Sequence, residues 1–304
     1  MTMWRIHAPS SSANLGPGFD VLGLALHLGI TLELEPDCQH GFELEISGES
    51  ADTLPRDRSN RILSVASEIA GDAVDEARWK IHSDIPLSRG LGSSAAAHAC
   101  GVAAGMLLRD GSPPPPEQLF QLVSNIEGHP DNAAACIDGG LQAGSGNSSS
   151  WNHVSLHIES VPRVLAVIPA VELETKHARA TLPDSYTRED AIINLGGIAS
   201  LLSGLACGDW DAVERGCLDR LHQPFRLPLI PGLAAALEAM GNEQELCGNW
   251  LSGAGPTLAA FVTKKETTVE VAESALAALE EAGTPARAEI LTIDHAGLQM
   301  EMIE

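Results

Sequence analysis

Apolar and polar residues alternate along two short segments near the start of the chain, residues 30–35 (I-T-L-E-L-E) and residues 42–47 (F-E-L-E-I-S). Side chains of a β-strand point alternately to opposite faces, so this period predicts two half-buried strands. Pro36 and Gly41 bracket the segment between them, which predicts a hairpin-like connection. Further strands are predicted at residues 4–8, 79–83 and 154–159.

A different period predicts helices. Residues 61–70 and 117–126 carry apolar side chains at the three- and four-residue spacing of one helical face. Strands in the first half come in runs and do not alternate regularly with helices, which favours an α+β fold over a doubly wound sheet. A second unit begins near residue 160, so the sequence predicts two domains, 1–160 and 161–304. Its predicted elements are strands at 164–168, 257–263 and 287–293 and helices at 190–207, 210–221, 232–240 and 267–282.

The charge balance narrows the class of protein. The 304 residues include 18 Lys+Arg against 41 Asp+Glu, a formal net charge of −23. Nucleic-acid binders and proteins held to anionic membranes need a basic face, so no nucleic-acid or membrane partner is expected. Only 4 of the cationic residues are lysines. A bound anion is therefore expected to be held by arginine and by backbone N–H groups.

The cysteines and the apolar runs bear on the compartment. The 6 cysteines are scattered without a C-x-x-C pair, which is typical of reduced, buried thiols. The first residues form no apolar signal region, and no uncharged apolar run approaches the roughly 18 residues that a membrane span requires. These features predict a soluble cytoplasmic protein.

A glycine-rich loop is the sharpest local feature, at residues 86–97 (P-L-S-R-G-L-G-S-S-A-A-A). Gly90 and Gly92 allow a tight turn, and Ser93 opens a predicted helix whose free N–H groups suit a phosphate. A P-loop is excluded because the segment lacks the required lysine. A dinucleotide-binding fingerprint needs a second strand after the helix, where the chain instead reads R-D-G-S-P-P-P-P. A glycine turn with a capped helix and no ligand stays open on this loop alone.

Two further motifs bear on that choice, residues 9–23 (P-S-S-S-A-N-L-G-P-G-F-D-V-L-G) and residues 251–257 (L-S-G-A-G-P-T). Together with the loop, and in this order, they resemble the signatures of the GHMP kinase family. The resemblance implies a two-domain fold, with an N-terminal kinase domain and a C-terminal ferredoxin-like α/β sandwich. It also implies that the loop wraps the triphosphate of ATP. The ATP-binding residues so implied are Asn60, Pro86, Leu87, Ser88, Arg89, Gly90, Leu91, Gly92, Ser93, Ser94, Ala95 and Ala96.

The resemblance further implies a Mg²⁺ ion held by a loop serine, Ser94 or its neighbour Ser93, and by Glu127. Mg²⁺ keeps several of its waters, so one or two protein oxygens suffice. On chemistry alone Glu127 is equally a solvated acid at a helix end. Asn60 is implied to lie near the adenine, although the sequence alone favours a helix cap for it.

Three other segments resemble the branch of the family that phosphorylates L-homoserine: E-G-H-P-D-N, T-K-H-A-R and Q-P-F-R. The carboxylate of an amino acid suits the planar donors of Arg179 and Arg226, and its ammonium suits Asp20. Each arginine alone could equally be a surface ion-pair partner. The remaining substrate-binding residues implied by the resemblance are Asn14, His129, Asp131, Asn132 and Thr175.

The implied reaction is in-line transfer of the ATP γ-phosphoryl group to the substrate hydroxyl. Asn132 stands where some members of the family place a basic aspartate, so we expect catalysis without a dedicated base, with Asn14, Asn132 and Arg179 as the catalytic residues. Asp20 is the rival base. Two alternatives stay open, a sibling kinase for another small alcohol such as L-threonine and a catalytically silent sensor of the same fold. A homo-oligomer, a dimer, is expected.

Overall fold

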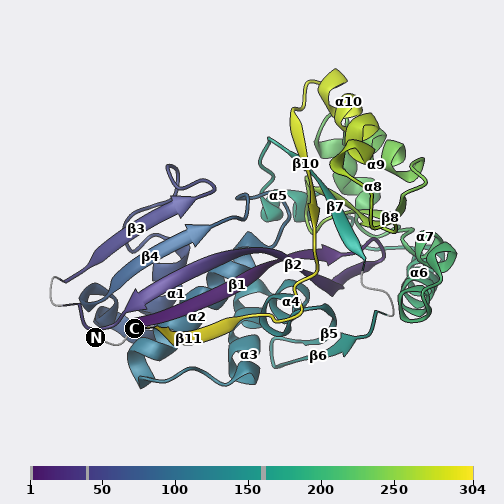
Figure 1. Cartoon of the computed structure of the whole chain (residues 1–304). Coiled ribbons are helices and arrows are strands. Elements are labelled where there is room, and N and C mark those ends of the chain that lie inside the picture. Colours follow the sequence, from purple (N-terminus) through teal and green to yellow (C-terminus); the bar gives the residue numbers. More distant parts are fainter. Residues whose placement is uncertain (1–2, 39–40, 159–161, 304) are drawn as a thin grey trace.

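The computed structural model describes residues 3–38, 41–158 and 162–303, and it divides their strands between two sheets (Figure 1). The first sheet has seven strands. Its path runs β11-β1-β2-β4-β3, and β5 and β6 extend it from β2. Its strands are β1 (Met3–Asn14), β2 (Gly18–Glu35), β3 (Glu43–Gly48), β4 (Arg78–Ser83), β5 (Leu141–Asn147), β6 (Ser150–Leu156) and β11 (Gln299–Ile303).

Four helices cover this first sheet (Figure 1). The central one, α2, packs against the sheet, α1, α3 and α4, so nearly its whole circumference is buried. That position explains its run of alanines and glycines, since small residues allow close approach on every side. The helices of this half are α1 (Arg61–Ala70), the 3₁₀ turn η1 (Gly71–Glu76), α2 (Ser93–Asp110), α3 (Pro116–Glu127) and α4 (Asp131–Asp138).

The second sheet has four antiparallel strands in the order β10-β7-β9-β8. With the intervening helices this gives the β-α-β-β-α-β arrangement expected of a ferredoxin-like sandwich. Helices α9 and α10 pack on one another and on the sheet. The strands are β7 (Arg163–Pro169), β8 (Leu246–Leu251), β9 (Leu258–Val262) and β10 (Ala286–Leu291). The helices are α5 (Thr175–Ala180), α6 (Arg188–Cys207), α7 (Trp210–Gly216), α8 (Gln223–Arg226), η2 (Leu227–Leu229), α9 (Leu233–Gly241), η3 (Val269–Ala272) and α10 (Glu273–Glu281).

The predicted hairpin between residues 30–35 and 42–47 is wrong. Both strands form, but β3 pairs in parallel with β4, and β4 pairs with β2. The edges of β2 at this level are already taken by β1 and β4, so β3 has no free edge of β2 to join. Alternation predicted the strands correctly because it reports burial of one face. It carries no information about which strand lies alongside.

Some predicted boundaries also change. The helix expected at 210–221 ends at Gly216, because the buried carboxylate of Asp219 accepts backbone N–H groups from residues 221–223 and turns the chain. The strand predicted at 287–293 forms as β10 in the second sheet. A further strand that the sequence did not predict, β11, pairs with β1 and so lies in the first sheet. The domain limits 1–160 and 161–304 stay a prediction, because the proposed boundary falls at residues outside the described ones.

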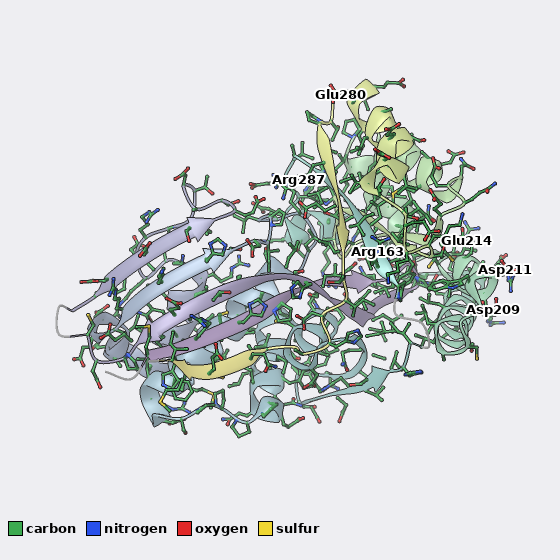
Figure 2. The ribbon with its side chains drawn as sticks, viewed as in Figure 1. Arg163, Asp209, Asp211, Glu214, Glu280 and Arg287 are labelled. Atoms are coloured by element: carbon green, nitrogen blue, oxygen red, sulfur yellow. The ribbon has the colours of Figure 1, made fainter. Side chains whose placement is uncertain are left out.

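The surplus acids lie on the surface. Asp209, Asp211 and Glu214, at and beside α7, are exposed examples (Figure 2). Within the described residues, α6 alone has the length and composition that a membrane span would need, and only 28% of its apolar window is buried. A single helix of this kind is weak evidence for a span, because helices of folded cores pass the same test.

Candidate active site

A cleft of about 960 Å³ lies where the first sheet, its helices and the loops of the second half meet. Most of the predicted site residues line it: Asn14, Asp20, Asn60, Leu87, Ser88, Gly90, Gly92, Ser93, Ser94, Ala95, Glu127, His129, Asp131, Asn132, Thr175, Arg179 and Arg226. The four predicted residues that do not line it are Pro86, Arg89, Leu91 and Ala96.

The glycine-rich loop forms one wall of the cleft and leads directly into α2. Gly92 has a φ of 70°, and a Cβ there would lie 2.1 Å from the Ser11 hydroxyl oxygen, so only glycine fits. A Cβ on Gly90 would similarly meet the Ser252 carbonyl oxygen at 2.3 Å. Among the described residues no side chain caps α2, so its first N–H groups and its positive dipole end face the cleft. This terminus suits an anion.

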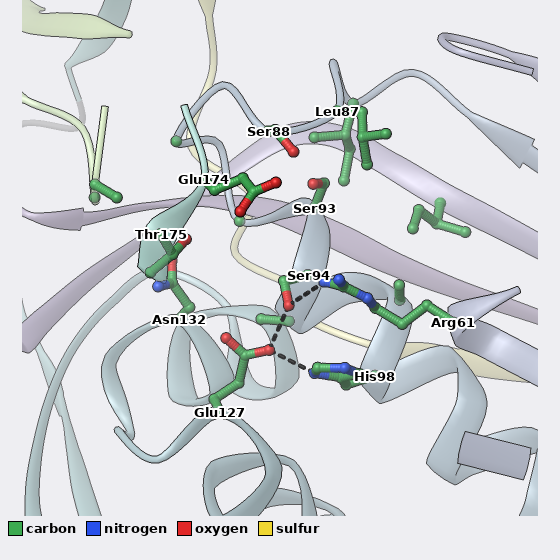
Figure 3. A pocket seen from close by; sticks show the side chains of 18 of the residues that line it. Arg61, Leu87, Ser88, Ser93, Ser94, His98, Glu127, Asn132, Glu174 and Thr175 are labelled. Carbon is green, nitrogen blue, oxygen red and sulfur yellow. Dashed lines mark hydrogen bonds and ion pairs between the residues drawn. The ribbon is translucent and has the colours of Figure 1, made fainter. Parts of the chain in front are cut away.

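Ser94, in the first turn of α2, joins a chain of polar contacts (Figure 3). Its hydroxyl donates to the Glu127 carboxylate at 2.8 Å and accepts from the Arg61 guanidinium at 2.7 Å. His98, one turn further along α2, contacts the same carboxylate oxygen. Burial alone would raise the pKa of Glu127, but its contacts with His98 and Ser94 lower the pKa below its usual value. The result is a buried, ionised carboxylate next to a hydroxyl.

The other end of the cleft carries a bidentate ion pair. Both terminal nitrogens of Arg179 contact the two carboxylate oxygens of Asp20 at 2.8 Å. The pair is partly open to solvent, with 42% of the Arg179 side chain and 31% of the Asp20 side chain exposed. The Arg179 guanidinium also lies 5.5 Å from the centre of the Phe19 ring. These two groups are therefore complementary to each other before any ligand is bound.

Arg226 lies deeper, behind the same ring. Its side chain is almost fully buried, its guanidinium lies 5.1 Å from the Phe19 ring centre, and one terminal nitrogen donates to the Gly253 carbonyl oxygen at 3.0 Å. Burial, together with the nearby Arg179, lowers the pKa of Arg226 to about 10. Its Nε has no hydrogen-bond partner among the described residues. Arg226 also lines the cleft, so its positive charge borders the same space as Asp20 and Arg179.

The groups between the two ends are held by short hydrogen bonds. Asn14, with a φ of 74°, donates from Nδ2 to the Gly253 carbonyl oxygen at 2.8 Å. The Asn132 side-chain oxygen accepts from the Ser11 hydroxyl at 2.8 Å. These contacts fix two side-chain amides next to the cleft.

His129 contacts Asp131 at 2.6 Å. Burial opposes the charged imidazole, but the Asp131 carboxylate prevails and raises the pKa of His129 to about 9. Ligand atoms of Asp20, His129 and Asp131 lie within 4.8 Å of one another. His129 and Asp131 contact each other, and Asp20 contacts Arg179, so these groups form an ion-pair cluster.

Three further predicted residues, Arg89, Asn60 and Thr175, differ in how they lie relative to the cleft. The Arg89 guanidinium is turned away from the cleft and donates to the carbonyl oxygens of Leu87 and Ala170 at 2.9 and 2.7 Å. Asn60 lines the cleft but caps α1, with its side-chain oxygen accepting from the Ile62 N–H at 3.1 Å. Thr175 lies at the start of α5 on the cleft wall. The cap that the sequence offered for Asn60 is present in the structure.

The sequence prediction missed Arg61, His98, Glu174 and Lys176, which also line the cleft. His98 stands four residues after Ser94, one helical turn, so that spacing could have identified it. For Arg61 the sequence holds no such signal, because only the packing of α1 against α2 brings it to Ser94.

Comparisons with known proteins agree with one another. The family model of the GHMP kinases N terminal domain matches residues 60–140, and that of the GHMP kinases C terminal domain matches residues 195–282. The homoserine kinase of Moorella thermoacetica is 38% identical, over 89% of this chain and 91% of its own length. That of Deinococcus radiodurans is 38% identical, over 98% of this chain and 97% of its own length.

Solved structures extend the likeness. The crystal structure of homoserine kinase from Cytophaga hutchinsonii superimposes with a TM-score of 0.81 at 25% identity, covering 98% of this chain and 97% of that one. Phosphomevalonate kinase from Streptococcus pneumoniae has a TM-score of 0.66 at 15% identity, over 95% of this chain and 99% of its own, and shows the shared fold alone. The expected α+β fold, with the N-terminal kinase domain of the GHMP kinases and a C-terminal ferredoxin-like sandwich, is confirmed.

Proposed function

The chain belongs to the GHMP kinase family, and on that premise we propose that it transfers the γ-phosphoryl group of ATP to the side-chain hydroxyl of L-homoserine. The product is O-phospho-L-homoserine, an intermediate of threonine biosynthesis. The observation that carries the proposal is a single cleft that joins an uncapped helix N-terminus at one end to Asp20, Arg179 and Arg226 at the other. One end suits phosphates and the other suits an amino acid, and this pairing agrees with the names of the relatives.

ATP would lie along residues 86–96, with its phosphates at the N-terminus of α2. The donor set beside that terminus fits a magnesium ion, because Ser94 and Glu127 offer a hydroxyl and an ionised carboxylate 2.8 Å apart. Bound Mg²⁺ would supply charge neutralisation for the phosphates. The same contact is our reason for assigning the magnesium serine to Ser94 and not to Ser93.

The amino acid would separate the ion pair between Asp20 and Arg179. Its ammonium would take Asp20, and its carboxylate would take Arg179 together with the guanidinium of Arg226, which also lines the cleft. A zwitterion thus replaces one bidentate contact with two charge-assisted ones. A mevalonate-type acid has no ammonium to offer Asp20, so it would leave that carboxylate without a partner.

Proton transfer needs no dedicated base in this site. The amide of Asn132 cannot accept the hydroxyl proton, and in the substrate complex the Asp20 carboxylate would be engaged by the ammonium group. Catalysis would instead rest on alignment by Asn14 and Asn132 and on charge stabilisation by Arg179 and the α2 terminus. In a largely dissociative phosphoryl transfer the hydroxyl proton can leave late, so positioning suffices.

A coupled ADP-release assay tests this function with L-homoserine, L-threonine, L-serine, mevalonate and galactose. We expect the highest kcat/KM with L-homoserine. A higher value with another alcohol would replace this function with that of a sibling kinase. Nucleotide binding without turnover of any of these alcohols would instead favour the silent sensor.

We further propose a cytoplasmic location and a dimer. The exposed apolar side chains of α6, Ile192 at 61% and Leu195 at 67% exposure, support a subunit contact on that helix. Sedimentation of the wild-type protein and of a Leu195→Glu variant tests it. A monomeric wild type, or a variant with unchanged mass, contradicts the proposal.

A further inference from the structure

One cation at the nucleotide end has no acidic partner. Arg61 is the first residue of α1, and its guanidinium donates to the Ser94 hydroxyl at 2.7 Å. Within the described part of the chain, no carboxylate lies at ion-pair distance from it. Arg58, three residues earlier, pairs with both Asp72 and Asp75.

The electrostatic surroundings of Arg61 are unfavourable without a ligand. Its positive charge lies beside the N-terminus of α2, which carries the positive end of the helix dipole and a set of unbonded N–H groups. Glu127 offsets part of this charge from below, but His98 and Ser94 already occupy it. Anionic oxygens above the first turn of α2 would satisfy both the helix terminus and the guanidinium.

The position also fits the cationic ligand that this loop lacks. The loop has no lysine. Its one arginine, Arg89, does not line the cleft, and its guanidinium donates to the carbonyl oxygens of Leu87 and Ala170. Arg61 reaches the first turn of α2 from the opposite wall (Figure 3). The start of α1 and the start of α2 thus meet at one point of the cleft.

We propose that Arg61 binds the terminal phosphates of the nucleotide, and that its hydrogen bond to Ser94 passes to a phosphate oxygen when the nucleotide binds. Ser94 then keeps its hydroxyl oxygen free on the cleft side. This inference rests on the proposed use of ATP, and it adds a nucleotide-binding residue that contacts phosphate from outside the glycine-rich loop.

Equilibrium binding by titration calorimetry tests the proposal with ATP, ADP and AMP in the absence of any amino acid. The variants are Arg61→Gln, which removes the charge, and Arg61→Lys, which keeps it without the planar fork. Arg56→Gln is the matched control, since Arg56 is exposed and does not line the cleft. We expect Arg61→Gln to raise the Kd of ATP about tenfold, as for loss of one charge-assisted hydrogen bond. The Kd of ATP for Arg61→Lys should lie between the values for wild type and Arg61→Gln. The Kd of AMP for Arg61→Gln should change less than twofold.

An ATP Kd within twofold of wild type for Arg61→Gln overturns the proposal. So does an equal loss for ATP and AMP together with a lowered Tm, because that result assigns Arg61 to the packing of α1 on α2. Wild type that binds ATP but does not phosphorylate L-homoserine overturns the proposed function and leaves Arg61 as a phosphate ligand. Wild type that binds no ATP overturns both.

Discussion

The two ends of the cleft are built in different ways. The nucleotide end consists mainly of backbone from one continuous stretch, the glycine-rich loop and the first turn of α2. The amino-acid end consists of charged side chains from segments far apart in the sequence, with Asp20 on β2, Arg179 on α5 and Arg226 on α8. Backbone groups bind any phosphate of suitable shape, whereas a constellation of charges selects one pattern of ligand charges. Specificity therefore belongs to the second end.

The two ends also differ before a ligand binds. Asp20 and Arg179 satisfy each other at 2.8 Å. Arg61 and the α2 terminus are both positive. Arg61 donates to the Ser94 hydroxyl, and that hydroxyl in turn donates to Glu127. A substrate must compete with an existing ion pair at one end, while a nucleotide relieves an unfavourable arrangement at the other. Substitutions should thus separate cleanly into effects on homoserine and effects on ATP.

The largest effect is expected from Arg226→Met, which keeps volume in a buried position but removes the charge. Loss of buried, charge-assisted contacts to the substrate carboxylate should lower kcat/KM for L-homoserine about 300-fold. The KM for ATP should change less than threefold, because Arg226 belongs to the other end. Steady-state kinetics with each substrate varied in turn measures both values.

Arg215→Met on exposed α7 serves as the control for this substitution. A circular-dichroism melt shows whether each variant is folded. If Arg226→Met impairs the use of ATP as much as that of L-homoserine while the protein stays folded, the division of roles between the two ends of the cleft does not hold.

The next largest effect is expected from Ser94→Ala, which should lower kcat/KM about 100-fold. It removes the hydroxyl that contacts both Glu127 and Arg61. Ser93→Ala is a matched neighbour on the same turn, and we expect a change of less than fivefold. The pair is measured at saturating Mg²⁺ and again with Mg²⁺ varied. Equal losses in both variants would contradict the assignment of Ser94.

Asp20→Asn should raise the KM for L-homoserine about tenfold, because the ammonium then meets a neutral amide. Its kcat should stay within twofold of wild type, since Asp20 is proposed to bind and not to accept the proton. A variant with kcat reduced about 100-fold and unchanged KM would make Asp20 the base. This result would sharpen the amino-acid end from a binding site into a catalytic one.

How far the sequence predicted this site follows from the same contrast. The nucleotide end is local, so the glycine spacing and the helix that follows it predicted the phosphate loop, and the structure has the loop and the helix there. Asp20, Arg179 and Arg226 were connected only by resemblance to a family, because no local pattern brings residues of three elements together. Arg61 was missed for that reason too. The partner of β3 depended on free strand edges, which a single segment does not encode.

Acid should destabilise the folded protein through His222, which is buried next to Arg226 with its Nε2 at 2.8 Å from the Gly16 carbonyl oxygen. Burial lowers the pKa of His222 to about 4. The unfolded chain binds a proton near pH 6.5 and the folded one does not, so stability is lost as pH falls from about 6.5 toward 4, by up to about 1.4 kcal/mol per pH unit. Urea unfolding at pH 7, 6 and 5 measures this slope. His222→Asn should flatten it, and an equal slope in the variant would remove His222 as the cause.

The smallest effect is expected from salt on ATP binding. An exposed cation such as Arg61 loses attraction for phosphate as salt screens it, which raises the KM for ATP. The same salt screens repulsion between ATP and a surface of net charge −23, which lowers it. The backbone N–H groups of α2 would be in direct contact with phosphate, so salt would screen that contact little. We therefore expect the KM for ATP to rise less than about threefold between 50 and 500 mM KCl.

In the Arg61→Gln variant this rise in KM should vanish or reverse, because only the repulsion between ATP and the acidic surface is left to screen. A steep rise that persists in this variant would mean that other surface cations hold the triphosphate, and the nucleotide end would then depend on side chains as much as the amino-acid end does.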